Sequence, residues 1–70
     1  GKVENATLSF EKCLEIEPKH SAALNGLGWI AKGKDKVDEA IEYWEKAVQA
    51  LPGATAALNG LGQTYMELEQ

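Results

Sequence analysis

The sequence predicts an all-α fold, an antiparallel helix-hairpin solenoid of about two repeats and four helices. The heptapeptide Ala-Ala-Leu-Asn-Gly-Leu-Gly occurs at 22–28 and again, without a change, at 56–62, thirty-four positions later. Apolar residues recur at steps of three and four around both copies, which is the spacing of one helix face. A period of this length is typical of chains whose supersecondary units stack and bury their apolar faces against one another.

The first helix is predicted over 3–17. Pro18 ends it, because a residue that precedes proline is pushed out of the helical region. Cys13 falls at a small-residue position of the apolar stripe, so we expect a buried, unreactive thiol. The stripe consists of Val3, Ala6, Thr7, Phe10, Cys13 and Leu14.

The second helix is predicted from about 22 to 32. Ser21 is the expected N-cap, and Gly33 is the expected C-terminal glycine. The stripe of this helix consists of Ala23, Leu24, Leu27, Ile30 and Ala31.

The third helix has the clearest periodicity. Asp35 is the expected N-cap, and Asp38 and Glu39 lie in the first turn, where the positive end of the helix dipole favours acidic groups. Pro52-Gly53 ends the helix. Its stripe consists of Val37, Ala40, Ile41, Trp44, Ala47, Val48 and Leu51.

Thr55 is expected to cap a fourth helix. This helix carries an apolar side made of Leu58, Leu61, Tyr65 and Leu68. All connections between the helices are short, so consecutive helices are predicted to pack as antiparallel hairpins.

The composition favours a protein partner. The chain has no arginine, seven lysines and eleven acidic residues, for a net charge of −4, and its lysines are scattered. Nucleic acids and anionic membranes need a concentrated positive surface, so neither is an expected partner. No apolar run reaches the roughly 20 residues that span a bilayer. A single cysteine excludes an internal disulfide and favours a reducing, cytoplasmic location.

Nothing in the sequence indicates an enzyme. His20, the only histidine, falls in a connector, where we expect a solvated loop residue. No Cys/His cluster has metal-ligand spacing, and the glycine-rich segments lie within helices and lack the Lys-Ser/Thr ending of a phosphate loop. We therefore predict no catalytic residue, no cofactor and no metal site.

The chain resembles the tetratricopeptide repeat family over essentially all of its 70 residues. The family pattern is a Leu-Gly pair in one helix, then an alanine, a large aromatic and a small residue in the next, and a terminal proline. The matching residues are Leu27, Gly28, Ala40, Trp44, Ala47 and Pro52, with Leu61 and Gly62 in the following copy and Ala6, Phe10, Cys13 and Pro18 in the preceding one.

The resemblance also implies how the chain divides. Within a single domain fragment at 1–70, helix 3–17 is the second half of a repeat, 21–54 is a full repeat, and 55–70 is the first helix of the next repeat. We therefore expect a segment of a longer protein. Two positions depart from the family pattern: Ala31 replaces an aromatic residue, and Asp35 stands where the family often has glycine. From this departure we expect the second helix to end slightly early, with an altered turn after it.

The resemblance implies a protein-binding groove on the side of the first helix of each repeat that faces away from the core. Such grooves receive an extended or helical segment of a partner protein. An asparagine side chain can pair with a peptide bond, and an exposed tryptophan is a frequent anchor. The candidate groove residues are Ala22, Asn25, Gly26, Trp29, Lys32, Asn59, Gly60 and Gln63, with Ala56 and Glu67 on the same side.

Alternatives remain open at this stage. The asparagines are equally consistent with plain exposed helix positions, and Trp29 with packing on Lys32 or over Gly26. A second hypothesis is a homo-oligomer, or packing against the rest of a longer chain, through the end helices. Apolar residues expected to be partly uncovered there are Leu8, Ile16, Leu58, Met66 and Leu68.

Overall fold

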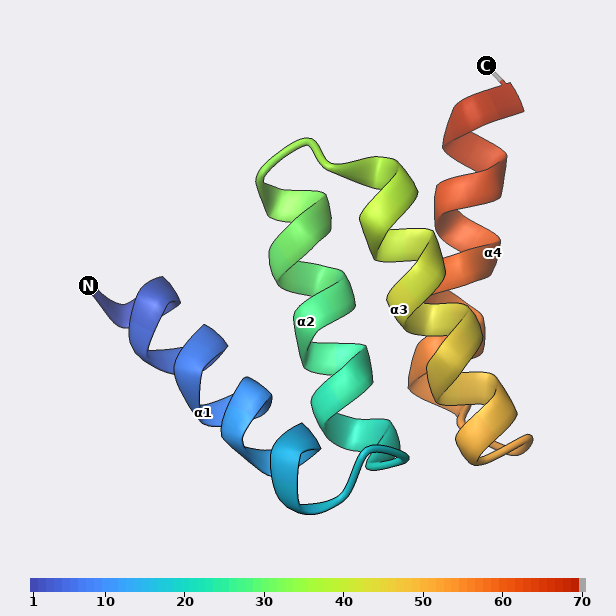
Figure 1. Cartoon of the computed structure of the whole chain (residues 1–70). Helices are drawn as coiled ribbons and strands as arrows, with labels where there is room; N and C mark the ends of the chain where they lie inside the picture. Colours follow the sequence, from blue (N-terminus) through green and yellow to red (C-terminus); the bar gives the residue numbers. More distant parts are fainter. Residues whose placement is uncertain (70) are drawn as a thin grey trace.

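The computed structural model describes residues 1–69, and within them it contains four α-helices and no strand. The helices are α1 (Lys2–Ile16), α2 (Ser21–Gly33), α3 (Val37–Ala50) and α4 (Thr55–Glu69). Figure 1 shows consecutive helices running antiparallel, joined by short connections and arranged side by side in chain order. The predicted all-α helix-hairpin architecture is confirmed. Residue 70, the last of the predicted fourth helix, lies outside the described residues.

Trp44 of α3 occupies the centre of the core. Its side chain is 0% exposed. A Cβ atom added to Gly28 of α2 would lie 2.5 Å from the indole Nε1, and one added to Gly60 of α4 would lie 2.6 Å from Cε2. The two glycines therefore let α2 and α4 approach the ring from two sides, since the distance between packed helices depends on the side chains at the contact.

α1 is held less tightly than α3. Its Phe10 packs on Gly26 of α2, where an added Cβ would lie 2.5 Å from the ring carbon Cζ. None of the α1 side chains is fully buried, and Val3 is 48% exposed. The prediction of a buried thiol at Cys13 is wrong, because Cys13 is exposed. The equivalent Ala47 is buried in the core formed with α2, but no helix of the described residues covers the same side of α1.

The apolar side of α4 is only partly covered, as predicted for Leu58, Met66 and Leu68. The buried residues of α4 are Ala57, Gly60 and Thr64. The predicted apolar side lies largely in solvent, since Leu58 is 46% exposed and Tyr65 44%. α4 turns Gly60 toward Trp44 of α3, and Leu61 packs against the core, whereas Leu58, Met66 and Leu68 are exposed.

The starts of α2 and α4 are organised differently from the expectation. His20 is the N-cap of α2, and its Nδ1 accepts a hydrogen bond from the Ala23 N–H at 3.2 Å. Ser21 is the first helical residue, and its hydroxyl donates to the Ala47 carbonyl of α3 at 3.3 Å. Thr55 is likewise the first residue of α4, so neither residue caps its helix. His20 is therefore a structural residue and not merely a solvated one.

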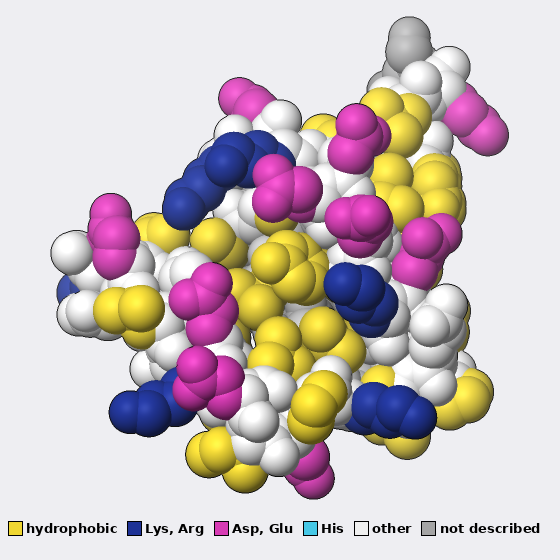
Figure 2. All heavy atoms as spheres, in the orientation of Figure 1, with side chains coloured by type: hydrophobic (Ala, Val, Ile, Leu, Met, Phe, Trp, Pro, Cys, Tyr) yellow, Lys and Arg dark blue, Asp and Glu magenta, His cyan; other side chains and the backbone are white. Residues whose placement is uncertain are grey.

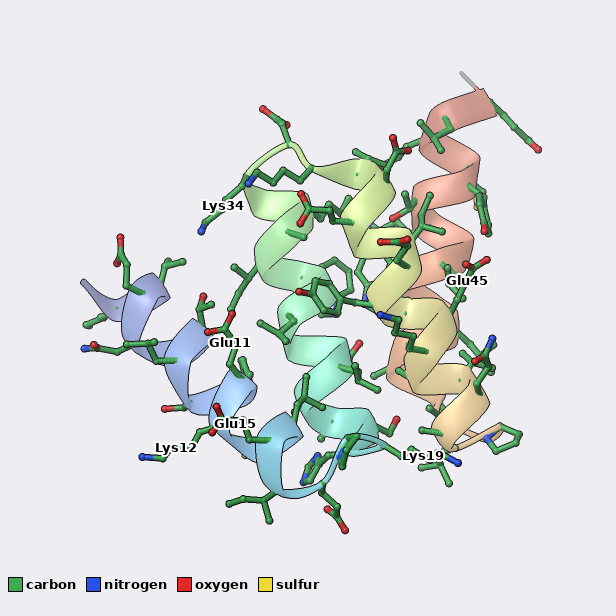
Figure 3. The ribbon with its side chains drawn as sticks, in the orientation of Figure 1. Glu11, Lys12, Glu15, Lys19, Lys34 and Glu45 are labelled. Carbon is green, nitrogen blue, oxygen red and sulfur yellow. The ribbon has the colours of Figure 1, made fainter. Side chains whose placement is uncertain are left out.

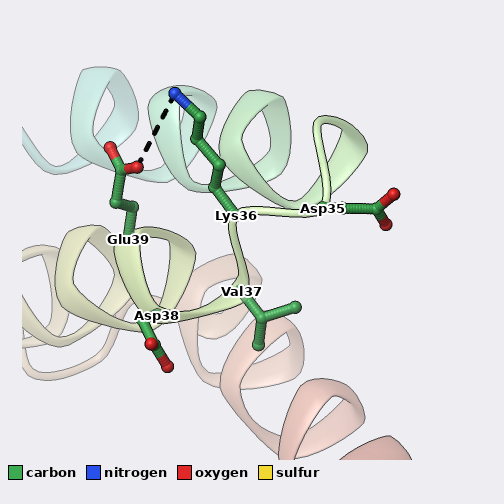
Figure 4. A pocket seen from close by; sticks show the side chains of 5 residues that line it. All are labelled: Asp35, Lys36, Val37, Asp38 and Glu39. Atoms are coloured by element: carbon green, nitrogen blue, oxygen red, sulfur yellow. Dashed lines mark ion pairs between the residues drawn. The ribbon is translucent and has the colours of Figure 1, made fainter.

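The turn between α2 and α3 places Asp35 in an unusual conformation. α2 continues through Gly33, so it does not end early, and Asp35 has a φ of 62°, in the left-handed region that favours glycine. Lys36 stands directly before α3, so Asp35 is not the cap. Figure 4 shows the Asp35 carboxylate pointing away from the ion pair of Lys36 with Glu39, whose N–O distance is 3.9 Å.

Candidate functional site

Trp29 is an exposed aromatic side chain that contacts the core through Trp44. It lies in the middle of α2 and is 40% exposed. Its ring meets the buried Trp44 ring at a centroid distance of 5.0 Å and an interplanar angle of 71°, an edge-to-face contact. Such a contact is favourable beyond the area it buries. The exposed face of Trp29 is therefore presented in a fixed orientation.

Lys32 connects Trp29 to α4. Its Nζ atom lies 5.4 Å from the centroid of the Trp29 ring and 2.8 Å from Oε1 of Glu67. The side chain of Lys32 is only 19% exposed, whereas that of Glu67 is 54% exposed. The ammonium group thus interacts with the aromatic face and with a carboxylate at once. This joins α2 and α4 on one side of the molecule.

The remaining candidates on this side differ in accessibility. Ala22, Asn59 and Gln63 are exposed, and Asn25 is partly buried. The Asn25 Oδ1 atom is enclosed and has no hydrogen-bond partner among the described residues. An enclosed acceptor without a partner is costly, so Asn25 is not simply a solvated helix residue.

Gly26 and Gly60 do not lie on the open side. The Phe10 ring covers Gly26, and the Trp44 ring covers Gly60, with an added Cβ meeting ring carbons at 2.5 Å and 2.6 Å. Their placement in a groove was therefore wrong, because both glycines serve the approach of the preceding helix. A binding role for the six other candidates stays a prediction.

A mostly apolar cleft of about 540 Å³ adjoins Trp29, between the start of α1 and the end of α2. Figure 3 shows Lys34 extending from the end of α2 toward α1. Across the cleft, a hydrogen bond from its own backbone N–H and the nearby amino terminus lower the pKa of Glu4, with a smaller contribution from Lys34. The lining residues are Val3, Glu4, Trp29, Ile30, Gly33 and Lys34.

Sequence reasoning missed this cleft. Val3 and Ile30 were assigned to core stripes because of their apolar periodicity. A buried apolar side of a helix and a partly covered one give the same periodicity. Only the splayed packing of α1, which has no fully buried side chain, distinguishes the two cases.

A polar contact also joins α3 and α4. The Tyr65 hydroxyl donates to Oε2 of Glu45 at 3.4 Å. Partial desolvation, followed by the negative charge of Glu45, raises the pKa of the Tyr65 phenol. Figure 3 shows Glu45 on α3 at the side of α4.

Antiparallel helices with a thirty-four-residue period and an indole between two glycines define a helical repeat protein. Models of the tetratricopeptide repeat match the chain at residues 1–20 and 21–54. The chain belongs to the tetratricopeptide repeat family. A comparison with curated proteins finds no match.

Tetratricopeptide repeats are generally protein–protein interaction modules and are typically not enzymes. Among residues 1–69, no cluster of His, Cys, Asp and Glu side chains could hold a metal ion. In the same part of the chain, none of the helices combines the length and the apolar character needed to cross a bilayer.

Proposed function

We propose that the chain binds an extended or helical segment of a partner protein on the side of α2 and α4 that carries Trp29. The observation that carries the proposal is the geometry of Trp29, which is 40% exposed yet held edge-on by Trp44. An aromatic anchor that is already ordered loses little side-chain entropy on binding. We call this region the Trp29 surface, and its members are Ala22, Asn25, Trp29, Lys32, Asn59 and Gln63.

The charges around Trp29 favour a mixed polar and apolar partner segment. Lys32 is held by Glu67 at 2.8 Å, so a carboxylate of the partner competes with Glu67 for the ammonium group. Glu67 is the more exposed member of the pair and can in turn pair with a basic side chain of the partner. The net charge of −4 favours the approach of a neutral or basic segment.

Selection of peptides from a random display library against the purified chain tests the proposal. For a selected peptide, we expect Trp29→Ala to weaken binding by about thirtyfold or more, the effect of losing a hot-spot residue. Fluorescence anisotropy of the labelled peptide measures the affinity. Gln49→Ala, at an exposed position of α3, is the control and should bind as the wild type does.

A second variant separates recognition from folding, since Trp29 also contacts the core residue Trp44. Lys32→Gln keeps most of the length of the side chain, leaves Trp29 in place and removes the charge. Circular dichroism should show native helix content in both variants. Equal affinity of the wild type, Trp29→Ala and Lys32→Gln for every selected peptide would exclude the Trp29 surface as the binding site.

Self-association through the end helices is the second candidate function. The observation that favours it is the large apolar exposure of α1 and α4, since exposed patches of this kind mark association surfaces. Figure 2 shows hydrophobic side chains along the outer side of α4. The exposed fractions are Leu8 63%, Ile16 82%, Leu58 46%, Met66 66% and Leu68 59%.

A further inference from the structure

We propose that copies of this chain stack head to tail, with α1 of one copy covering the exposed side of α4 of the preceding copy. The contact would reproduce the one that α3 makes with α2 inside the chain. This inference rests on the second candidate function, self-association, and specifies the surfaces involved. Peptide binding at the Trp29 surface is a separate proposal, although Trp29 also lines the cleft that the stack would fill.

The sequence makes the two pairs of helices equivalent. A shift of thirty-four positions places α1 on α3 and α4 on α2. Val3 then matches Val37, Phe10 matches Trp44, and Leu58 matches Leu24. α1 therefore carries the apolar side that α3 turns toward α2, and α4 carries the side that receives it.

The receiving side is buried on α2 and open on α4. Leu24 is 4% exposed, whereas its counterpart Leu58 is 46% exposed. Gly28 is packed against Trp44, whereas an added Cβ on its counterpart Gly62 would meet nothing within 4 Å. α4 thus exposes the same residue pattern that α2 packs against α3, including Gly62, on which an aromatic ring could pack as Trp44 packs on Gly28.

The matching side of α1 is also open. Trp44 is packed between two glycines, on α2 and α4, but Phe10 is packed on Gly26 alone and remains partly exposed. Cys13 is exposed, whereas its counterpart Ala47 is 0% exposed. In a head-to-tail stack, Phe10 of one copy packs on Gly62 of the preceding copy, and the Cys13 side chain enters the same contact.

The cleft beside Trp29 provides a further observation. Shifted by thirty-four positions, its lining residues Ile30 and Gly33 correspond to Thr64 and Glu67 of α4. Thr64 is 1% exposed, and Glu67 is bonded to Lys32 of α2. By the same shift, α4 of the preceding copy fills the cleft of about 540 Å³.

The ends of the two helices are complementary in charge. Lys2 lies at the start of α1, where the Gly1 amino group is already paired with Glu4 at 3.1 Å, and the last turn of α4 carries Glu67 and Glu69 with no basic residue. An antiparallel α4–α1 contact between copies sets Lys2 of one copy beside the acidic end of α4 in the preceding copy. The helix dipoles act in the same direction.

Because the two surfaces are different, the contact is heterologous, and a contact of this kind that does not close forms open chains. Sedimentation of the purified chain from micromolar to millimolar concentration, under reducing conditions, tests this. We expect the average mass of the wild type to keep rising with concentration. Gln49→Ala, on the exposed side of α3, should behave as the wild type does.

Two variants each block one surface. Gly62→Ala places a methyl group where the ring of Phe10 must pack, as an added Cβ on Gly28 would lie 2.5 Å from Trp44. Cys13→Glu places a charge on the side of α1 that enters the contact. Both positions are open within one copy, so each variant should fold, and each should associate about tenfold or more weakly than the wild type.

A mixture of the two variants gives the sharpest result. Gly62→Ala keeps an intact α1, and Cys13→Glu keeps an intact α4, so together they should form one dimer and grow no further. Failure of the mixture to form dimers overturns the proposal. If Gly62→Ala blocks association but Cys13→Glu does not, the copies pair symmetrically through α4, and self-association survives without the head-to-tail contact. If the wild type stays monomeric at every concentration, both the head-to-tail contact and self-association are overturned.

Discussion

α2 and α4 contain the same seven residues, Ala-Ala-Leu-Asn-Gly-Leu-Gly, in two different environments. In α2 both glycines of this segment are covered by aromatic rings, Gly26 by Phe10 and Gly28 by Trp44. In α4 only Gly60 is covered, and Gly62 is open. The segment forms a helix in both places, so its helical conformation is compatible with either environment. Which of its residues contribute to the core is decided by the helices on either side.

The largest difference between the copies is expected at the leucine of the segment. Leu24→Ala removes a side chain that is 4% exposed within the core cluster, and should destabilise the chain by about 2–5 kcal/mol. Leu58→Ala removes the same side chain where it is 46% exposed, and should cost less than about 1 kcal/mol. Urea unfolding followed by circular dichroism measures both free energies.

These measurements need dilute protein, because association through α4 would bury Leu58 and raise its contribution. Equal losses for the two variants in monomeric protein would mean that the two copies of the segment are equally buried, contrary to the structure. A loss at Leu58 that grows with protein concentration would instead support the head-to-tail contact.

The second difference is expected at the last glycine of the segment, where the same Gly→Ala substitution should change stability in opposite directions in the two copies. Gly28→Ala forces a methyl group against the Trp44 ring, which Gly60 holds from the other side, and should destabilise the chain by about 1–3 kcal/mol. Gly62→Ala meets nothing within 4 Å, so only the helix propensity changes, and stability should rise by about 0.5–1 kcal/mol. The thermal midpoints of the two variants should therefore move in opposite directions.

A gain in stability from Gly28→Ala would show that α2 and α3 can separate without cost. It would then no longer be correct to describe Trp44 as held between two glycines. Gly60→Ala is the matched control on the other side of the ring, where an added Cβ would lie 2.6 Å from Cε2. It should destabilise the chain as Gly28→Ala does.

The fold could be predicted from the sequence because its main signals are local and repeated. Periodicity gives the helices, and short connections give antiparallel neighbours. The stripe of α1 was correct as an apolar side but wrong as a buried one at Cys13, whereas Leu58 of α4 was expected to be partly uncovered and is 46% exposed. Periodicity reports which side of a helix is apolar, and the presence of a neighbour on that side is not encoded within the helix.

The candidate site was predictable in part for a related reason. Trp29 and Lys32 were placed on one side of α2 by helical spacing, and they do lie together, with Nζ 5.4 Å from the ring centroid. Gly26 was assigned to the same side and instead packs under Phe10. A glycine has no side chain whose character indicates its surroundings, so spacing alone could not tell an open glycine from one under a ring.

The smallest expected difference lies at the starts of α2 and α4. His20 accepts a hydrogen bond from Ala23 N–H at 3.2 Å, whereas its counterpart Ala54 has no side-chain acceptor. The Ala54 carbonyl accepts the first helical bond, from Leu58 N–H at 3.0 Å, so Ala54 occupies the N-cap position of α4. His20→Ala should therefore cost about 0.5–2 kcal/mol, because an N–H of the first turn of α2 loses its acceptor.

Ala54→Ser supplies the acceptor that α4 lacks and should raise stability by up to about 1 kcal/mol. The effect should be confined to the start of α4, where hydrogen exchange of the first-turn amides measures it directly. Slower exchange in α4 of Ala54→Ser, together with faster exchange in α2 of His20→Ala, is the expected pair of results. If Ala54→Ser leaves exchange at the start of α4 unchanged, the lack of a capping side chain does not distinguish the two helices. The difference between them then lies entirely in their neighbours.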